Sequence, residues 1–376
     1  MNIEELKNVS VIGAGDMGHG IAEVALLCGY PVNLYDINTE AVEKGKGRIL
    51  DSVDMLASKG KIPADQPEQV RGKLSTSIDI QQAVEAADLV IEAAPEVLDL
   101  KKKIFGGLDK HAPDSAVLAS NTSTMSITDI AASTDRADRV FGIHFFNPAV
   151  IMKLVEVIRT EQSSDETVTL GMEFAKKLGK LPVEVRKDTP GFIANRVNQA
   201  PMLLYGEIIQ RGELQPEALD AFMRTQGSPM GPCELFDYIG MDIMVNMSKY
   251  FAETLDPDYG PPEHMVTMLE SGKLGKKSGQ GYYDWSSGRP KIDLDAATTE
   301  FDPVLPIVAQ VNEASKLVED DVCSFEDVDT AMINSTGNPT GPVSAARGMS
   351  NDDVVDKLKG LATKYGKSLF EPTQTI

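Results

Sequence analysis

Val11-Ile12-Gly13-Ala14-Gly15-Asp16-Met17-Gly18 is the stretch that decides the fold of this 376-residue chain. It continues a short buried strand expected at residues 8–12 and begins a helix expected at residues 16–29; a second strand is expected at residues 31–36. In this setting the first glycine makes a tight turn, the second lets a pyrophosphate approach the backbone, and the third lets the helix pack on the strand. The stretch therefore predicts a dinucleotide site in a β–α–β unit.

Asp36 indicates which dinucleotide binds. It ends the second expected strand, 18 positions after Gly18. A carboxylate there accepts hydrogen bonds from the ribose hydroxyls of NAD and repels the 2′-phosphate of NADP. The unpaired N–H groups and positive dipole at the start of the 16–29 helix attract the phosphates. We expect NAD; a strand-end cap is the alternative role for Asp36, and a flavin is the alternative ligand.

Strands and helices alternate through the first half of the chain. A charged helical stretch is expected at about residues 40–61. Further strands are expected at residues 88–94, 116–121, 139–146 and 153–158, the last two joined by a short connection around Asn147-Pro148. This alternation predicts an α/β fold of Rossmann type, with a doubly wound, mainly parallel sheet, in a domain of residues 1–187.

The second half of the chain has a helical pattern. It begins after Asp188-Thr189-Pro190-Gly191, and residues 286–295 form a polar linker. An Asp-x-x-Met helix followed by Gly-x-Pro-x-Gly-Pro occurs twice, at residues 220–232 and 329–342. So short a match can also arise by chance. The features follow in the same order in both halves, which favours duplication. We expect two all-α C-terminal domains, residues 188–285 and 296–376.

Composition excludes several classes of partner. The chain has 57 acidic and 36 basic residues and a formal net charge of −21, which argues against nucleic acid and anionic membranes. No apolar stretch approaches the roughly 20 residues that cross a bilayer. The first seven residues are charged and leave no room for a signal peptide. We therefore expect a cytoplasmic protein.

The cysteines give no sign of a metal site. Cys28, Cys233 and Cys323 lie far apart and lack the spacing of metal ligands. Buried, reduced thiols are the expected state of all three, and no metal is expected.

His144 is the candidate general base. It is one of four histidines, and it ends an apolar strand within Gly142-Ile-His-Phe-Phe-Asn-Pro148. Oxidation of an alcohol needs a base for the hydroxyl proton, and imidazole suits that task near neutral pH. A core histidine held by one backbone hydrogen bond is the alternative.

Glu156 supports the catalytic interpretation of His144. It interrupts the apolar run Leu154-Val-Glu-Val-Ile158, where a carboxylate is costly unless it is paired. If the two strands are neighbours, the carboxylate can meet the imidazole and fix its tautomer. A solvent-facing strand residue is the alternative.

Ser120-Asn121-Thr122-Ser123 follows another strand end, on the side of the sheet where ligands bind in such folds. Its hydroxyls and amide suit a substrate oxygen or the nicotinamide ribose. A helix N-cap is the competing interpretation, and both roles are compatible.

With these motifs the chain resembles the 3-hydroxyacyl-CoA dehydrogenase family. The resemblance covers residues 8–285 in family order. Its further motifs are Ala119-Ser-Asn-Thr-Ser123, His144-Phe-Phe-Asn-Pro148, Met152-Lys-Leu-Val-Glu-Val157, Asp188-Thr-Pro-Gly-Phe-Ile193, Asn195-Arg196, Pro229-Met-Gly-Pro232 and Gly275-Lys-Lys-Ser-Gly-Gln-Gly-Tyr-Tyr283.

The resemblance implies NAD-dependent oxidation of an L-3-hydroxyacyl-CoA, such as short-chain 3-hydroxybutyryl-CoA, to the 3-ketoacyl-CoA in the β-oxidation branch of fatty acid metabolism. His144 would be the base and Glu156 its orienting partner. Ser123, Asn147 and Asn195 would hold the substrate oxygen and complete the site. The positions that match family residues near NAD are Glu96, Lys101, Asn121, Ser123, Asn147 and Lys277, and those that match residues touching coenzyme A are Ser52 and Lys59.

Two alternative functions and the oligomeric state stay open beside this expectation. A related NAD-dependent dehydrogenase of a free 3-hydroxy acid, of the gulonate dehydrogenase type, would share the NAD site and the His–Glu pair. A non-catalytic, crystallin-like relative would share the fold alone. Short family members end near Tyr283 and form dimers through the helical domain. The repeat here allows either a homodimer or a monomer in which the repeat fills that surface.

Overall fold

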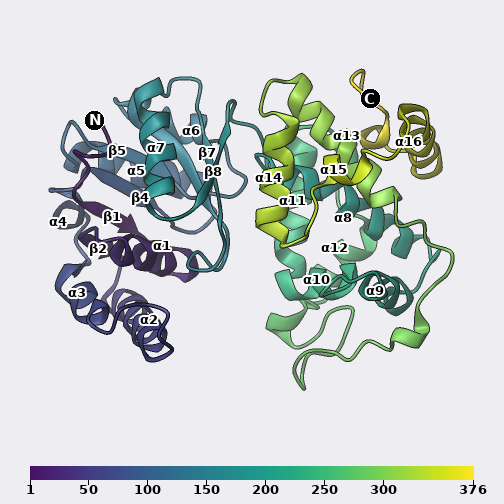
Figure 1. Cartoon of the computed structure of the whole chain (residues 1–376), viewed down its shortest axis with the longest axis horizontal. Coiled ribbons are helices and arrows are strands. Elements are labelled where there is room, and N and C mark those ends of the chain that lie inside the picture. Colours follow the sequence, from purple (N-terminus) through teal and green to yellow (C-terminus); the bar gives the residue numbers. More distant parts are fainter. The chain divides into compact units, whose positions relative to one another are not determined.

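The computed structural model describes residues 1–376. The chain forms two compact units: residues 1–193 with 321–339, and residues 194–320 with 340–376 (Figure 1). Residues 321–339, which the sequence pattern places in the second helical repeat, therefore group with the sheet.

The first unit is built on one eight-stranded sheet in the order β3-β2-β1-β4-β5-β6-β7-β8. Its strands are β1 (Val9–Ile12), β2 (Val32–Tyr35), β3 (Leu74–Ser77), β4 (Leu89–Glu92), β5 (Val117–Ser120), β6 (Val140–Phe145), β7 (Leu154–Ile158) and β8 (Leu181–Val185). Neighbouring strands from β3 to β6 are parallel; β7 is antiparallel to β6, and β8 is parallel to β7. The predicted doubly wound sheet is confirmed.

Strand β8 was not predicted from the sequence. Pro182 stands inside it and breaks the usual strand pattern. Proline is tolerated here because β8 is the edge strand, where a missing N–H removes no inner ladder bond.

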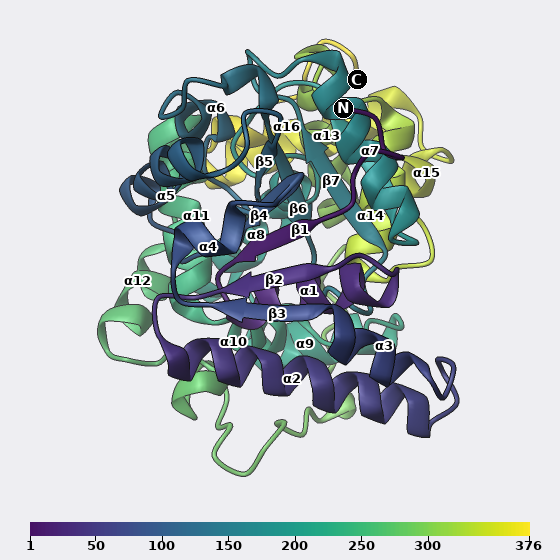
Figure 2. The ribbon, with the colours of Figure 1, turned by 90° about the vertical axis from the view of Figure 1, so that its left-hand side faces the viewer.

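Helices cover both faces of the sheet (Figures 1 and 2). Those of the first unit are α1 (Asp16–Leu27), α2 (Thr39–Ser58), α3 (Gln66–Lys73), α4 (Ile80–Val84), α5 (Leu98–His111), α6 (Ile127–Ala131), α7 (Asp165–Lys177) and α14 (Phe325–Thr336). Val155 and Val157 of β7 join a core cluster with Phe174 of α7. Because side chains alternate along a strand, Glu156 points to the opposite face.

Helix α1 ends earlier than predicted. Its last residue is Leu27, and Cys28 is an exposed C-cap residue. The expectation that Cys28 is buried was therefore wrong, because the apolar pattern continues past the point where the helix stops. Cys233 and Cys323 are buried and unbridged, as expected.

The second unit is helical. It contains α8 (Ala194–Gln210), α9 (Pro216–Thr225), α10 (Pro232–Ile239), α11 (Met241–Thr254), α12 (Glu263–Glu270), α13 (Leu305–Glu319), α15 (Pro342–Ala346) and α16 (Asn351–Tyr365). Along the chain, the series α8 to α11 recurs as α13 to α16. In each series the last proline of Gly-x-Pro-x-Gly-Pro is the first residue of a helix, where its fixed φ and missing N–H are harmless.

A buried ionic cluster joins α8 to α13 within the second unit. Glu313 has no exposed surface, and its carboxylate accepts hydrogen bonds from Arg196 Nε at 2.7 Å and Tyr259 Oη at 2.6 Å. Lys316 Nζ lies 2.6 Å from the same carboxylate. Burial alone would raise the pKa of Glu313, but the two cations outweigh it and hold the pKa low.

No helix of the chain is long and apolar enough to span a membrane.

Helix α2 packs directly on the glycine-rich turn. A Cβ built on Gly45 would lie 2.8 Å from both the Cβ and the carbonyl oxygen of Ala14. By contrast, Gly47, two positions further along α2, has no atom within 4 Å of its would-be Cβ. The close approach at Gly45 therefore helps to fix the turn.

We predict opposite effects for Gly45→Ala and Gly47→Ala. The first should lower the free energy of unfolding by about 1–3 kcal/mol because the methyl group meets backbone. The second should raise it by roughly 0.5–1 kcal/mol because alanine favours a helix. Urea unfolding of both variants checks this; equal stabilisation by both substitutions would contradict the packing described.

Candidate active site

The three glycines of the turn have different surroundings. A Cβ on Gly13, whose φ is +104°, would lie 2.6 Å from Ala93 O, and one on Gly18 would lie 1.8 Å from Gly13 O. A Cβ on Gly15 would meet nothing within 4 Å. Gly13 and Gly18 are thus required by packing, while Gly15 leaves open space at the N-terminus of α1. A pyrophosphate fits this combination of space and unpaired N–H groups.

Asp36, directly after β2, holds the glycine-rich turn by hydrogen bonds. Its Oδ2 accepts a hydrogen bond from Ala14 N at 2.8 Å, and its Oδ1 accepts one from Ile37 N at 2.7 Å. Each carboxylate oxygen keeps further lone-pair capacity for a ribose hydroxyl. The cap role and the ribose role are therefore compatible. Asp16 points outward and pairs with Arg48 at 2.6 Å, and Met17 packs against the core.

Exposed apolar side chains follow the strands near Asp36. Ile37 comes after β2 and is 79% exposed, Ile78 comes after β3 and is 54% exposed, and Val97 precedes α5 and is 52% exposed. All three follow the carboxyl end of a strand, on the side of the sheet where Asp36 lies, and exposed apolar side chains there suit the face of an adenine ring. They were not predicted from the sequence; for Ile37 and Ile78 the available signal was an isoleucine one or two residues after the last residue of a strand.

Lys101 is buried beside Glu92, a residue that sequence analysis did not single out. The Lys101 ammonium lies 2.8 Å from Glu92 Oε1 and 3.3 Å from Glu96 Oε2. Glu92 is completely buried and also accepts a hydrogen bond from Ser120 Oγ at 2.6 Å. Lys101 is thus the counter-ion that makes a buried carboxylate tolerable at the end of β4.

Glu96 holds the loop after β5. Its Oε1 accepts hydrogen bonds from Ser123 N at 2.8 Å and Ser123 Oγ at 3.1 Å, and its carboxylate also accepts the Thr122 hydroxyl. Asn121 Oδ1 accepts Phe145 N at 2.9 Å, which ties the end of β5 to the end of β6. The N-cap of α6 is Ser126 rather than a residue of the 120–123 segment.

His144 and Glu156 stand opposite each other in the antiparallel β6–β7 pair. His144 Nδ1 lies 2.7 Å from Glu156 Oε2, and Glu156 Oε1 accepts Ile193 N at 3.1 Å. The histidine is 6% exposed and the glutamate fully buried, so the solvent-facing alternative for Glu156 was wrong. The Phe146 and Phe192 rings lie 4.4 and 5.8 Å from the imidazole. This arrangement leaves Nε2 as the nitrogen that can take a proton.

The remaining predicted residues lie on separate elements. Asn147 is exposed two residues after the end of β6, at a cis peptide bond to Pro148. In the second unit, Asn195 lies in the first turn of α8, and Lys277 lies in the 3₁₀ turn Lys276–Ser278, where it pairs with Asp242. Lys59 is the exposed C-cap of α2.

Ser52 has a partner that the sequence did not suggest. Its hydroxyl donates to Glu23 Oε1 across 2.6 Å between α2 and α1. Burial raises the pKa of Glu23 to about 7. The Ser52 hydroxyl is therefore engaged within the protein, although its oxygen can still accept a further hydrogen bond.

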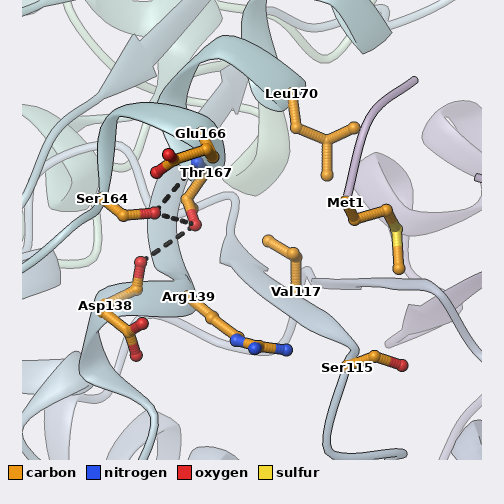
Figure 3. A pocket seen from close by; sticks show the side chains of 9 residues that line it. All are labelled: Met1, Ser115, Val117, Asp138, Arg139, Ser164, Glu166, Thr167 and Leu170. Carbon is orange, nitrogen blue, oxygen red and sulfur yellow. Dashed lines mark hydrogen bonds between the residues drawn. The ribbon is translucent and has the colours of Figure 1, made fainter.

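A separate cavity of about 230 Å³ lies away from these residues (Figure 3). Its lining residues are Met1, Ser115, Val117, Asp138, Arg139, Ser164, Glu166, Thr167 and Leu170. They stand where β5, β6 and α7 begin, at the opposite edge of the sheet from Asp36, Ser123 and His144. Ligands of such folds bind at the carboxyl ends of the strands, so this cavity is not the candidate active site.

A doubly wound sheet with this turn and this His–Glu pair defines an NAD-dependent oxidoreductase. The model of the 3-hydroxyacyl-CoA dehydrogenase NAD-binding domain matches residues 8–189, and that of the C-terminal domain of the same family matches residues 191–285 and 307–376. The chain belongs to the 3-hydroxyacyl-CoA dehydrogenase family.

Similar proteins differ in how much of the chain they match. A probable 3-hydroxybutyryl-CoA dehydrogenase of Bacillus subtilis is 42% identical over 75% of this chain and 98% of its own length. A 3-hydroxyadipyl-CoA dehydrogenase of Escherichia coli is 37% identical over 98% of this chain and 75% of its own. The crystal structure of an Escherichia coli 3-hydroxybutyryl-CoA dehydrogenase superposes with a TM-score of 0.89 and 30% identity, covering 99% of this chain and 97% of that one.

Proposed function

We propose that the protein oxidises L-3-hydroxyacyl-CoA, with short chains such as 3-hydroxybutyryl-CoA preferred, to 3-ketoacyl-CoA with NAD. The buried contact between His144 and Glu156 is the observation that carries this proposal. It stands at the same edge of the sheet as the glycine-rich turn, where a cofactor and a hydroxyl substrate can meet. The names of the similar proteins support the acyl-CoA as substrate.

His144 is the general base of the proposed reaction. Its Nδ1–H donates to Glu156 Oε2, which places the proton on Nδ1 and leaves the Nε2 lone pair for the hydroxyl proton at C3. Glu156 keeps this tautomer and stabilises the imidazolium that forms. When bound, NAD supplies the acceptor for the hydride that leaves C3. The Ile193 N–H holds the second oxygen of Glu156 and prevents the carboxylate from turning away.

Ser123, Asn147 and Asn195 are proposed to hold the substrate oxygen. In the present structure the Ser123 hydroxyl donates to Glu96, so its oxygen presents lone pairs. Those lone pairs suit the hydroxyl of the reduced substrate, which is a donor. To bind the ketone product, the Ser123 hydroxyl must rotate away from Glu96.

Coenzyme A requires local positive charge on this acidic chain. Lys59 at the end of α2 is exposed and close in sequence to Ser52, and both are proposed to contact coenzyme A. The cytoplasmic location, and the choice between homodimer and monomer, stay predictions.

The substrate class is tested by steady-state NADH formation on a panel of compounds. We expect kcat/KM to be highest for 3-hydroxybutyryl-CoA or a nearby chain length, and at least 100-fold lower for free 3-hydroxybutyrate and gulonate. The panel includes acyl chains from C4 to C16 and 3-hydroxyadipyl-CoA. Activity on free acids alone would favour the gulonate dehydrogenase type, and no activity on any compound would favour a non-catalytic relative.

We predict that His144→Gln lowers kcat by about 10²–10⁴-fold, because it removes the proton acceptor. The affinity for NADH, measured by fluorescence titration, should stay within about twofold because the ring lies apart from the glycine-rich turn. His111→Gln, at the exposed end of α5, is the matched control and should leave both quantities unchanged. A His144→Gln variant that turns over at the wild-type rate would remove this residue from the mechanism.

A further inference from the structure

Lys180 is a buried cation without a carboxylate partner. Its residue surface is only 8% exposed, although it stands between α7 and β8. Burial lowers the pKa of its ammonium. A lysine in such a place is costly unless its hydrogen bonds compensate.

Both hydrogen bonds of the Lys180 ammonium go to one loop. Its Nζ donates to Ala149 O at 2.5 Å and to Met152 O at 2.8 Å. Both carbonyls belong to residues 146–153, which join the strand of His144 to the strand of Glu156. The ammonium thus satisfies two backbone acceptors that have no strand partner.

The backbone at Lys180 is itself fixed. Gly179 has a φ of +72°, and its N–H donates to Lys176 O at 2.9 Å. The N–H of Lys180 donates to Ala175 O at 3.0 Å, which completes a Schellman ending of α7. Leu181 N then donates to Lys153 O at 2.8 Å and starts β8. The side chain therefore leaves from a rigid point on the sheet edge.

The loop has other contacts besides those with Lys180: Ala149 is part of the core cluster, and Val150 packs against it. Pro148 O accepts the N–H groups of Ile151 and Met152 at 3.0 and 2.9 Å. On the other side, Ala149 packs against α1, so closely that a Cβ on Gly20 would lie 3.2 Å from its methyl group. Lys180 and α1 hold the loop from two sides.

This loop begins at the candidate active site. The ring of Phe146 lies 4.4 Å from that of His144, and Asn147 is the next residue. A shift of the 149–152 backbone would carry both side chains with it.

We propose that Lys180 is a positioning residue, whose ammonium holds residues 146–153 so that Phe146 and Asn147 lie correctly beside His144. This inference rests on the proposed function for the role of Asn147. No contact of Lys180 with substrate or cofactor is part of this proposal.

The test replaces Lys180 by Met, which keeps the length of the side chain and removes its donors. We expect kcat/KM for 3-hydroxybutyryl-CoA to fall by about 10- to 100-fold, since small misplacements near a reacting centre have effects of this size. Affinity for NADH should change less than about threefold. Hydrogen exchange of the peptide that contains residues 146–153 should speed up about tenfold, while that of β4 and β5 stays unchanged.

Lys177→Met is the matched control. Lys177 is the last residue of α7, three positions before Lys180, but it is exposed and pairs with Glu4. It should retain wild-type kinetics and loop exchange. If Lys180→Met does not fold, Lys180→Gln is measured instead and should show the same two changes at smaller size.

Wild-type kcat/KM together with wild-type loop exchange in a folded Lys180 variant would overturn the proposal. A loss of thermal stability with unchanged kinetic constants would also overturn it, because that result describes a purely structural residue. If the wild-type protein does not oxidise hydroxyacyl-CoA, the proposed function fails. The exchange measurement still decides whether Lys180 holds the loop.

Discussion

The contact between His144 and Glu156 depends on one reversal of chain direction. In the order of the sheet, all neighbouring strands from β3 to β6 are parallel. The only antiparallel pair of neighbours is β6 and β7. That reversal places the two residues directly opposite each other, on the same face of the sheet, with their side chains 2.7 Å apart. The short loop that makes the reversal, residues 146–153, lies at the carboxyl ends of the parallel strands. The proposed base therefore stands where a cofactor on the glycine-rich turn can be reached.

The site is built with carboxylates, although it is proposed to bind an anionic cofactor and substrate. Each carboxylate has an internal donor that offsets its charge. Asp36 accepts two backbone N–H groups, Glu92 pairs with Lys101, and Glu96 accepts the Ser123 and Thr122 groups. The carboxylates thus hold in place the loops that present N–H groups and hydroxyls. This use of acidic residues reconciles the net charge of −21 with an anion-binding site.

The sequence predicts the features that depend on local pattern. The β–α–β unit, the parallel sheet and the contact between His144 and Glu156 follow from apolar runs and from the polar residues that interrupt them. Features that depend on tertiary packing were missed. Pro182 hid the edge strand β8. The local pattern also does not give the partners of two buried carboxylates, Lys101 for Glu92 and Ser52 for Glu23. The grouping of residues 321–339 with the sheet likewise follows from contacts between segments far apart in the chain.

Single-turnover hydride transfer in the Glu156→Gln variant tests the central claim most directly. The amide keeps the shape of the side chain but removes the negative charge that orients and stabilises the protonated imidazole. With NAD and 3-hydroxybutyryl-CoA at saturation, we predict that NADH forms about 10³–10⁴-fold more slowly than in the wild type, with unchanged NADH affinity. A rate within tenfold of the wild type would contradict the assignment of His144 and Glu156 as the base and its orienting partner.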